Sequence, residues 1–166
     1  MSFLDFPDDD PKRTARRPLL LFILATLVVG ALGSIVTEPA IPIWYAGLVH
    51  PSFAPPTYVF APVWTTLYVL MAAAAWRTWR VTGLKSPALI AYAVQLGLNL
   101  LWSVVFFGLH QIGAALAEIL VLILAILVTM ALFFRADRLA GLMMLPTLAW
   151  TLFAAALNHS FWLLNH

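Results

Sequence analysis

The stretch PLLLFILATLVVGALGSIVT, residues 18–37, is twenty residues long and contains no charged side chain. A helix needs about 20 apolar residues to cross the roughly 30 Å of hydrocarbon in a bilayer. Polar backbone groups in lipid must pair within the protein, which only helices and closed barrels achieve. The sequence lacks the alternating segments of about ten residues that are typical of a barrel. We therefore expect helices that span a membrane. Further uncharged runs occupy residues 39–76, 86–117, 119–134 and 139–166.

The composition excludes a soluble globular enzyme. Hydrophobic residues make up 63% of the chain and charged residues 10%, and the mean hydropathy is +0.96. A soluble domain carries about 25% charged residues, and a domain of about 150 residues buries only about 70% of its unfolded surface. Because too much apolar surface would otherwise face water, we expect lipid to surround the chain.

The uncharged runs predict an all-α integral membrane protein with a bundle of five transmembrane helices. Residues 39–56 are rich in proline, glycine and aromatic residues, which predicts a loop at the start of the second run. The predicted spans are residues 18–37, 57–76, 87–109, 112–134 and 139–163. Together they form one transmembrane domain, residues 18–166. Residues 1–17, with three successive aspartates and two prolines, are predicted to be a disordered polar tail.

The basic residues predict one orientation. All nine Lys and Arg residues lie before the first span, between the second and third, or between the fourth and fifth. The positive-inside rule then places the N-terminus in the cytoplasm and the C-terminus outside. The first span exceeds the length of about 7–15 residues that is typical of a signal-peptide core, so we expect an uncleaved helix. Helical apolar spans favour a bacterial inner membrane.

Several kinds of chemistry have no sequence support. The basic residues form short clusters instead of a stripe, which excludes a nucleic-acid surface. The chain has no cysteine, and no phosphate-binding loop, paired-histidine motif or Ser/His/Asp set is recognisable. We therefore predict no metal site and no required cofactor.

Three predicted helices carry aromatic and amide side chains on one face, at intervals of three or four residues. Amides within a membrane are costly unless they meet a partner helix, a ligand or water. Such faces suit a flat, mostly apolar ligand that is held by ring stacking and a few hydrogen bonds. Alternatively, Gln95, Asn99 and Asn158 bond one another and only hold the bundle together. The faces comprise Trp64, Tyr68 and Met71; Gln95, Asn99, Trp102 and Phe106; and Pro146, Trp150, Ala154 and Asn158, with Phe153 and Leu157 beside them.

Other features of the spans and loops leave alternatives open. The loop WYAGLVHPSFAPP, residues 44–56, is stiffened by prolines and is either a lid over the bundle or a plain interfacial loop. Glu118, an acid within a span, either handles protons or ligand or extends to the membrane surface. The nearly pure aliphatic run 119–129 predicts a helix that faces lipid. The small pairs Ala93/Gly97 and Gly113/Ala117 allow close helix approach, within the bundle or across a dimer.

The sequence resembles the translocator protein family, whose members are also called tryptophan-rich sensory proteins or peripheral-type benzodiazepine receptors (TspO/MBR). The resemblance covers roughly residues 30–162. It departs from many relatives at His50 and Phe53, which replace Lys and Trp. The matching residues, in chain order, are Trp44, Tyr45, Leu48, Pro51, Pro55, Pro56, Val59, Phe60, Trp64, Leu67, Tyr68, Met71, Gln95, Asn99, Trp102, Phe106, Phe107, Pro146, Trp150, Phe153, Ala154, Leu157 and Asn158.

The resemblance implies a five-helix bundle, usually a homodimer, with a ligand cavity under the loop between the first two helices. It implies binding of porphyrins such as protoporphyrin IX or haem, for sensing or transport rather than enzymatic turnover. The alternative is light-dependent porphyrin degradation, for which the tryptophans that match Trp64 and Trp150 are implicated. The predicted ligand-binding residues are Tyr45, Pro55, Trp64, Tyr68, Gln95, Asn99, Trp102, Phe106, Trp150, Phe153, Ala154 and Asn158.

Overall fold

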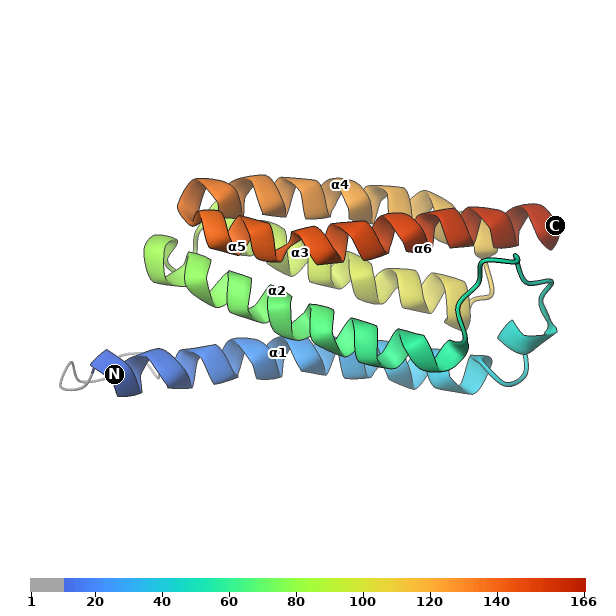
Figure 1. Cartoon of the computed structure of the whole chain (residues 1–166), viewed down its shortest axis with the longest axis horizontal. Coiled ribbons are helices and arrows are strands. Elements are labelled where there is room, and N and C mark those ends of the chain that lie inside the picture. Colours follow the sequence, from blue (N-terminus) through green and yellow to red (C-terminus); the bar gives the residue numbers. More distant parts are fainter. Residues whose placement is uncertain (1–10) are drawn as a thin grey trace.

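A computed structural model describes the backbone of residues 11–166 and the side chains from Arg17 onward, and it shows a bundle of long helices (Figure 1). In this part of the chain five helices are long and apolar enough to span a membrane. The prediction of an all-α fold with five transmembrane helices is therefore confirmed. The five stretches are Arg17–Ala40, Thr57–Thr82, Pro87–Gly108, Ile112–Ala136 and Arg138–Leu164.

The helical elements follow the predicted spans with differences at their ends. The α-helices are α1 (Pro11–Ala40), α2 (Phe60–Thr82), α3 (Pro87–Ser103), α4 (Ile112–Ala136), the short α5 (Arg138–Met143) and α6 (Leu145–Leu164). Short turns η1 (Tyr45–Gly47), η2 (Thr57–Val59) and η3 (Val104–Gly108) complete the order. The expected polar tail of residues 1–17 overlaps α1. Its residues 11–17 form the first turns of that helix, and residues 1–10 lie outside the described residues.

Two differences from the predicted spans have local physical causes. Helix α2 continues to Thr82, beyond the predicted end at residue 76, and stops at Gly83, whose φ of 77° favours glycine. Its last turns carry Arg77 and Arg80 and so extend past the uncharged run on which the prediction relied. The fifth span consists of two pieces, α5 and α6. They divide at Met144 because Pro146 lacks an N–H group and its ring obstructs the preceding turn.

Helix α4 does not simply face lipid, which corrects the prediction from its aliphatic run. It packs against α3, α5 and α6 through a buried stripe at intervals of three or four residues. Only its other face, which includes Leu120 and Leu124, is exposed. An aliphatic helix suits a protein core as well as lipid, so composition alone did not separate the two. The stripe comprises Ala115, Ile119, Leu122, Ile126, Thr129 and Phe133.

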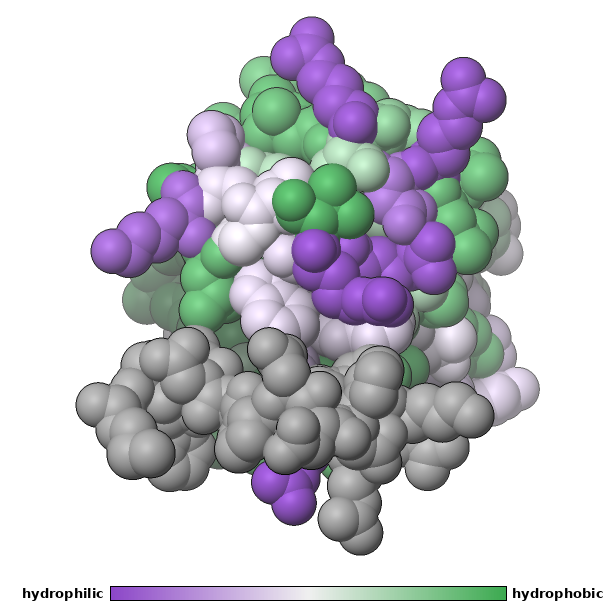
Figure 2. All heavy atoms as spheres, turned by 90° about the vertical axis from the view of Figure 1, so that its left-hand side faces the viewer, coloured by the Kyte–Doolittle hydropathy of each residue, from purple (hydrophilic) through white to green (hydrophobic). Residues whose placement is uncertain are grey.

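Basic side chains gather at one end of the bundle. The α2–α3 and α4–α5 connections lie at the end where α1 begins (Figure 1). Viewed from that end, hydrophilic side chains stand out from the apolar body (Figure 2). Arg80 lies over the ring of Trp76 at 4.9 Å. The segregation of charge that the sequence predicts is thus realised in space.

An ion pair joins the two connections at this end. The Arg77 guanidinium donates to Asp137 Oδ2 at 2.7 Å, and the other carboxylate oxygen accepts the N–H of Ala140 at 2.9 Å. Asp137 therefore caps the first turn of α5 and also ties that turn to the end of α2. The hydrogen bond from Arg77 and the one from Ala140 hold the pKa of Asp137 below its usual value.

We predict that Asp137→Ala lowers the thermal midpoint of the detergent-solubilised protein, because the cap alone contributes about 1 kcal/mol. Asp137→Asn, which keeps an acceptor for Ala140, should lose less. Since the folded-state pKa is lowered, this contribution is present above the ordinary aspartate pKa and disappears as the pH falls through the folded value. Melting curves with exposed Lys85→Ala as control test the prediction. Equal midpoints for Asp137→Ala and the wild type would contradict it.

Candidate ligand-binding cavity

A cavity of about 350 Å³ lies between α1, α2, α3, η3 and α6, toward the end of the bundle opposite the basic connections. Tyr45 of η1 closes it from the side of the first loop. Ligand pockets commonly have volumes of about 300–1,000 Å³, so the cavity has room for a small organic molecule. Helix α4 contributes no side chain to the described lining.

Nine of the twelve predicted ligand-binding residues line this cavity. They are Tyr45, Trp64, Tyr68, Asn99, Trp102, Phe106, Trp150, Ala154 and Asn158. The structure does not place Pro55, Gln95 or Phe153 in the lining. Gln95 is buried in the core, where its amide nitrogen donates to the sulfur of Met71 at 3.1 Å. Phe153 instead packs against Phe53 in the loop and against Trp150.

Aromatic donors hold two of the three predicted amides in place. Tyr68 Oη donates to Asn99 Oδ1 at 2.5 Å, which joins α2 to α3. Trp102 Nε1 donates to Asn158 Oδ1 at 3.1 Å, and Asn158 Nδ2 donates to the carbonyl oxygen of Ile112 at 2.9 Å. Asn99 and Asn158 therefore connect helices, but the amides do not bond one another as the alternative proposed. The connections run through ring donors and the backbone, and both residues also line the cavity.

Two polar atoms of the lining residues are buried and have no hydrogen-bond partner. They are Tyr45 Oη and Trp150 Nε1. A buried donor without a partner costs about 1–3 kcal/mol. Burial raises the pKa of Tyr45, so its phenol stays neutral and can donate at physiological pH. Two residues of the cavity wall thus each contain a buried donor that the protein leaves without a partner.

A π-helical turn shapes the wall formed by the third span. The Leu109 N–H bonds the carbonyl of Val104 at 2.8 Å, which widens the helix at η3. Phe106 and Phe107 both line the cavity as a result, whereas regular helical spacing predicted only Phe106. The ring of Phe106 stacks on Trp102, with centroids 5.1 Å apart and planes 22° from parallel.

Helix α1 supplies lining residues that the sequence analysis missed. A Cβ atom at Gly30 would collide with the ring of Tyr68, so glycine is needed for this close approach of α1 and α2. Small and hydroxyl residues recur at intervals of three or four in this half of the span, a signal that could have indicated its inward face. The missed α1 residues are Leu27, Gly30, Ala31, Gly33, Ser34, Thr37 and Glu38.

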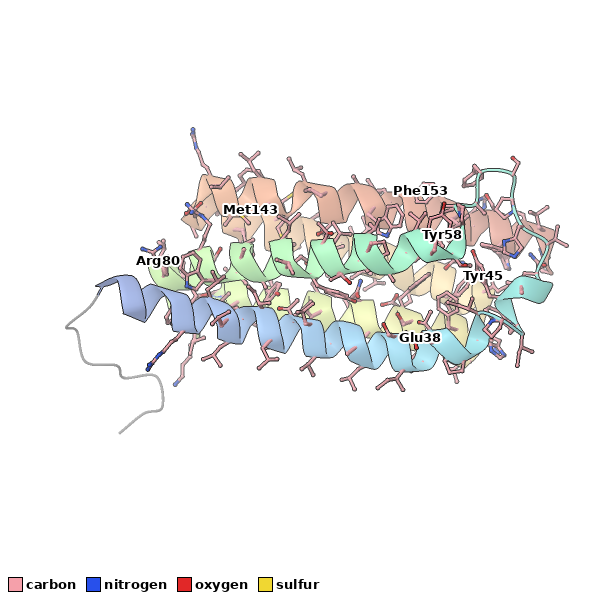
Figure 3. All side chains as sticks on the ribbon, turned by 60° about the horizontal axis from the view of Figure 1, so that its bottom comes forward. Glu38, Tyr45, Tyr58, Arg80, Met143 and Phe153 are labelled. Atoms are coloured by element: carbon pink, nitrogen blue, oxygen red, sulfur yellow. The ribbon has the colours of Figure 1, made fainter. Side chains whose placement is uncertain are left out.

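The first loop is attached to the end of α6. Asn165 Oδ1 accepts the N–H of Val49 at 2.8 Å, and Asn165 Nδ2 donates to the carbonyl of Val49 at 3.1 Å. Tyr45 packs against Phe161 with ring centroids 5.2 Å apart. Tyr45, Phe153 and Glu38 lie at the same end of the bundle, away from Arg80 (Figure 3). The loop therefore lies across the helices beside the cavity.

Glu118 stands apart from the cavity. Both of its carboxylate oxygens are buried without a hydrogen-bond partner, but it does not line the cavity. Among the described residues, no three His, Asp or Glu side chains lie close enough to hold a metal ion.

The chain is similar to several known proteins over most of its length. It is 40% identical to tryptophan-rich protein TspO of Archaeoglobus fulgidus over 149 residues. This match covers 89% of this chain and 96% of the relative. It is 42% identical over 122 residues to tryptophan-rich sensory protein of Cereibacter sphaeroides, covering 74% and 77%. It is 38% identical over 127 residues to the translocator protein of Homo sapiens, covering 74% and 75%. Residues 22–163 match the TspO/MBR family, and the chain belongs to this family.

Proposed function

We propose that this protein binds a porphyrin-like tetrapyrrole, or a related flat apolar molecule, in the cavity between α1, α2, α3, η3 and α6. Binding would serve sensing or translocation of the ligand at the membrane. The observation that carries the proposal is the combination of aromatic walls with two buried donors that lack a partner, Tyr45 Oη and Trp150 Nε1.

The walls suit a flat ring system. Trp102 and Phe106 are stacked on each other, and Trp64 lies beside Tyr68 with centroids 5.7 Å apart. Each well-placed aromatic contact with a ligand ring contributes about 0.5–1.5 kcal/mol beyond the area that it buries. Acceptor atoms at the edge of the ligand would satisfy the phenol of Tyr45 and the indole of Trp150.

The cavity also has an opening through which a ligand would enter. Ser34 and Glu38 on α1 and Ala61 and Thr65 on α2 line the cavity and are exposed at the surface of the isolated chain. The opening therefore lies between these two helices, where a ligand dissolved in lipid would enter. A molecule larger than the cavity, such as a whole tetrapyrrole, would extend through it.

The lining favours a metal-free porphyrin over haem as the ligand. The described lining residues include neither His nor Met, the side chains that most often hold haem iron. Oxygen atoms such as the phenol of Tyr45 would be the available ligands to iron. Protoporphyrin IX is thus the first probe to use, and the protein needs no cofactor in this proposal.

We expect Trp150→Phe to weaken protoporphyrin IX binding about two- to tenfold, because it keeps a ring but removes one donor. Asn99→Ala should also weaken binding, since it releases Tyr68 from its partner. Trp76→Phe is the matched control: its Nε1 is likewise buried and unpartnered but lies outside the cavity lining. Titrations followed by porphyrin absorbance measure the affinities. Equal affinities for Trp150→Phe, Asn99→Ala and Trp76→Phe would overturn the proposed site.

A second candidate function is light-dependent oxidation of the bound porphyrin by dioxygen. Trp64 and Trp150, the implicated tryptophans, both line the cavity, whereas Trp76 does not. Under illumination in air we expect bound porphyrin to lose absorbance more slowly in Trp64→Phe and Trp150→Phe than in the wild type and Trp76→Phe. Rates are to be compared at full occupancy. Equal rates in all four proteins would leave binding as the sole function.

We infer that the protein is a homodimer that contacts its second copy through α3. Ala93 and Gly97 are exposed, and a Cβ added to Gly97 would meet no atom within 4 Å. Small exposed residues at this spacing let two helix backbones approach closely. At the corresponding glycine of α4, Gly113, an added Cβ would instead contact the indole of Trp162 of the same chain.

Orientation and assembly can be tested together because the chain contains no cysteine. We propose that the N-terminus lies in the cytoplasm of a bacterial cell and the C-terminus outside the inner membrane. Ser52→Cys should then react with an impermeant maleimide from outside, and Leu84→Cys only after permeabilisation. Gly97→Cys should form a cross-linked dimer on oxidation, unlike exposed Leu124→Cys on α4. Reversed labelling would refute the orientation, and equal cross-linking at both positions would refute the interface.

A further inference from the structure

Among the described residues that line the cavity, Glu38 is the one charged side chain. It lies in the last turn of α1, two residues before the helix ends at Ala40. It is exposed, as are its neighbours at the opening, Ser34 on α1 and Thr65 on α2. A ligand that enters between α1 and α2 therefore passes this carboxylate.

Glu38 forms no salt bridge with any residue that the structure describes. The ion pair among those residues, Arg77–Asp137, lies at the opposite end of the bundle. Figure 3 shows this separation, with Arg80 toward one end and Glu38 and Tyr45 toward the other. His50 and His110 belong to the loop and to the end of the third span, and neither lines the cavity. The carboxylate of Glu38 therefore makes the opening negative.

We propose that Glu38 is a specificity-determining residue that disfavours ligand carboxylates and favours flat ligands whose polar edge is neutral or cationic. The inference rests on the proposed function, because it concerns the ligand of the same cavity. The described lining residues that can donate a hydrogen bond are all neutral, among them Ser34, Tyr45 and Asn99. A ligand carboxylate would find no cation among the lining residues and would meet a like charge at the opening.

Protoporphyrin IX and its dimethyl ester form the critical pair of probes. They share one ring system, so stacking on Trp102 and Phe106 is equal, but only the free acid carries carboxylates. The wild type should bind the ester more tightly than the acid. Glu38→Gln should tighten binding of the acid about three- to tenfold and leave the ester unchanged. Because the residue is exposed, the substitution leaves the packed core untouched.

Two further variants, a charge reversal and a control, separate the effect of Glu38 from any effect of the detergent on porphyrin binding. Glu38→Lys should invert the preference, so that the acid binds more tightly than the ester. Glu118→Gln removes an acid that does not line the cavity, and it should bind both probes like the wild type. Added salt should narrow the difference between the probes in the wild type, since the opening is accessible to ions.

The possible results separate the two proposals. If both porphyrins bind but Glu38→Gln and Glu38→Lys shift neither affinity, the charge selection is overturned while the proposed function stands. If Glu118→Gln shifts the acid as much as Glu38→Gln does, the effect is general electrostatics, and the assignment to Glu38 is overturned. If the wild type binds neither porphyrin, the proposed function fails, and the selection that rests on it fails as well.

Discussion

Hydrogen bonds from aromatic donors to amides are the interactions on which the cavity depends. An amide in lipid must be paired, and Tyr68 and Trp102 pair Asn99 and Asn158 from neighbouring helices. Each bond places a large ring at a defined angle beside a helix contact, so satisfying the amide also builds a wall. The same requirement applies to the indole N–H of Trp150, which is buried and has no acceptor within the protein. Its lack of a partner therefore points to a ligand atom as the missing acceptor.

Three local departures from regular helix packing open space beside these bonds. The missing side chain of Gly30 lets the ring of Tyr68 lie against α1. The π-helical turn η3 brings Phe107 to the wall next to Phe106. The break before Pro146 separates α5, which is tied to α2 at the basic end, from α6, which lines the cavity. A bundle of regular helices with leucine at these positions would fill its own interior.

The spans and nine of the residues that line the cavity could be predicted from the sequence because lipid imposes strong rules on charge and polarity. Uncharged runs located five helices, and helical periodicity put Trp64, Asn99 and Trp150 on inward faces. Helical periodicity predicts which way a side chain points, but not whether it meets the cavity or the packed core there. Gln95 therefore shares a face with Asn99 and yet lies in the packed core. Phe107 depended on a π-helical turn, which alters the spacing on which the prediction relied.

The individual lining residues of helix α1 were the larger omission from the predicted site, and their contribution joins orientation to ligand choice. The inward face of this helix consists of small residues, which give no periodic aromatic or amide signal, and ends in Glu38. All nine Lys and Arg residues lie in the segments that predict the cytoplasmic side. The opposite half of the bundle therefore has no Lys or Arg to neutralise a carboxylate. The same charge distribution that predicts the orientation thereby leaves the Glu38 carboxylate without a basic partner at the opening of the cavity.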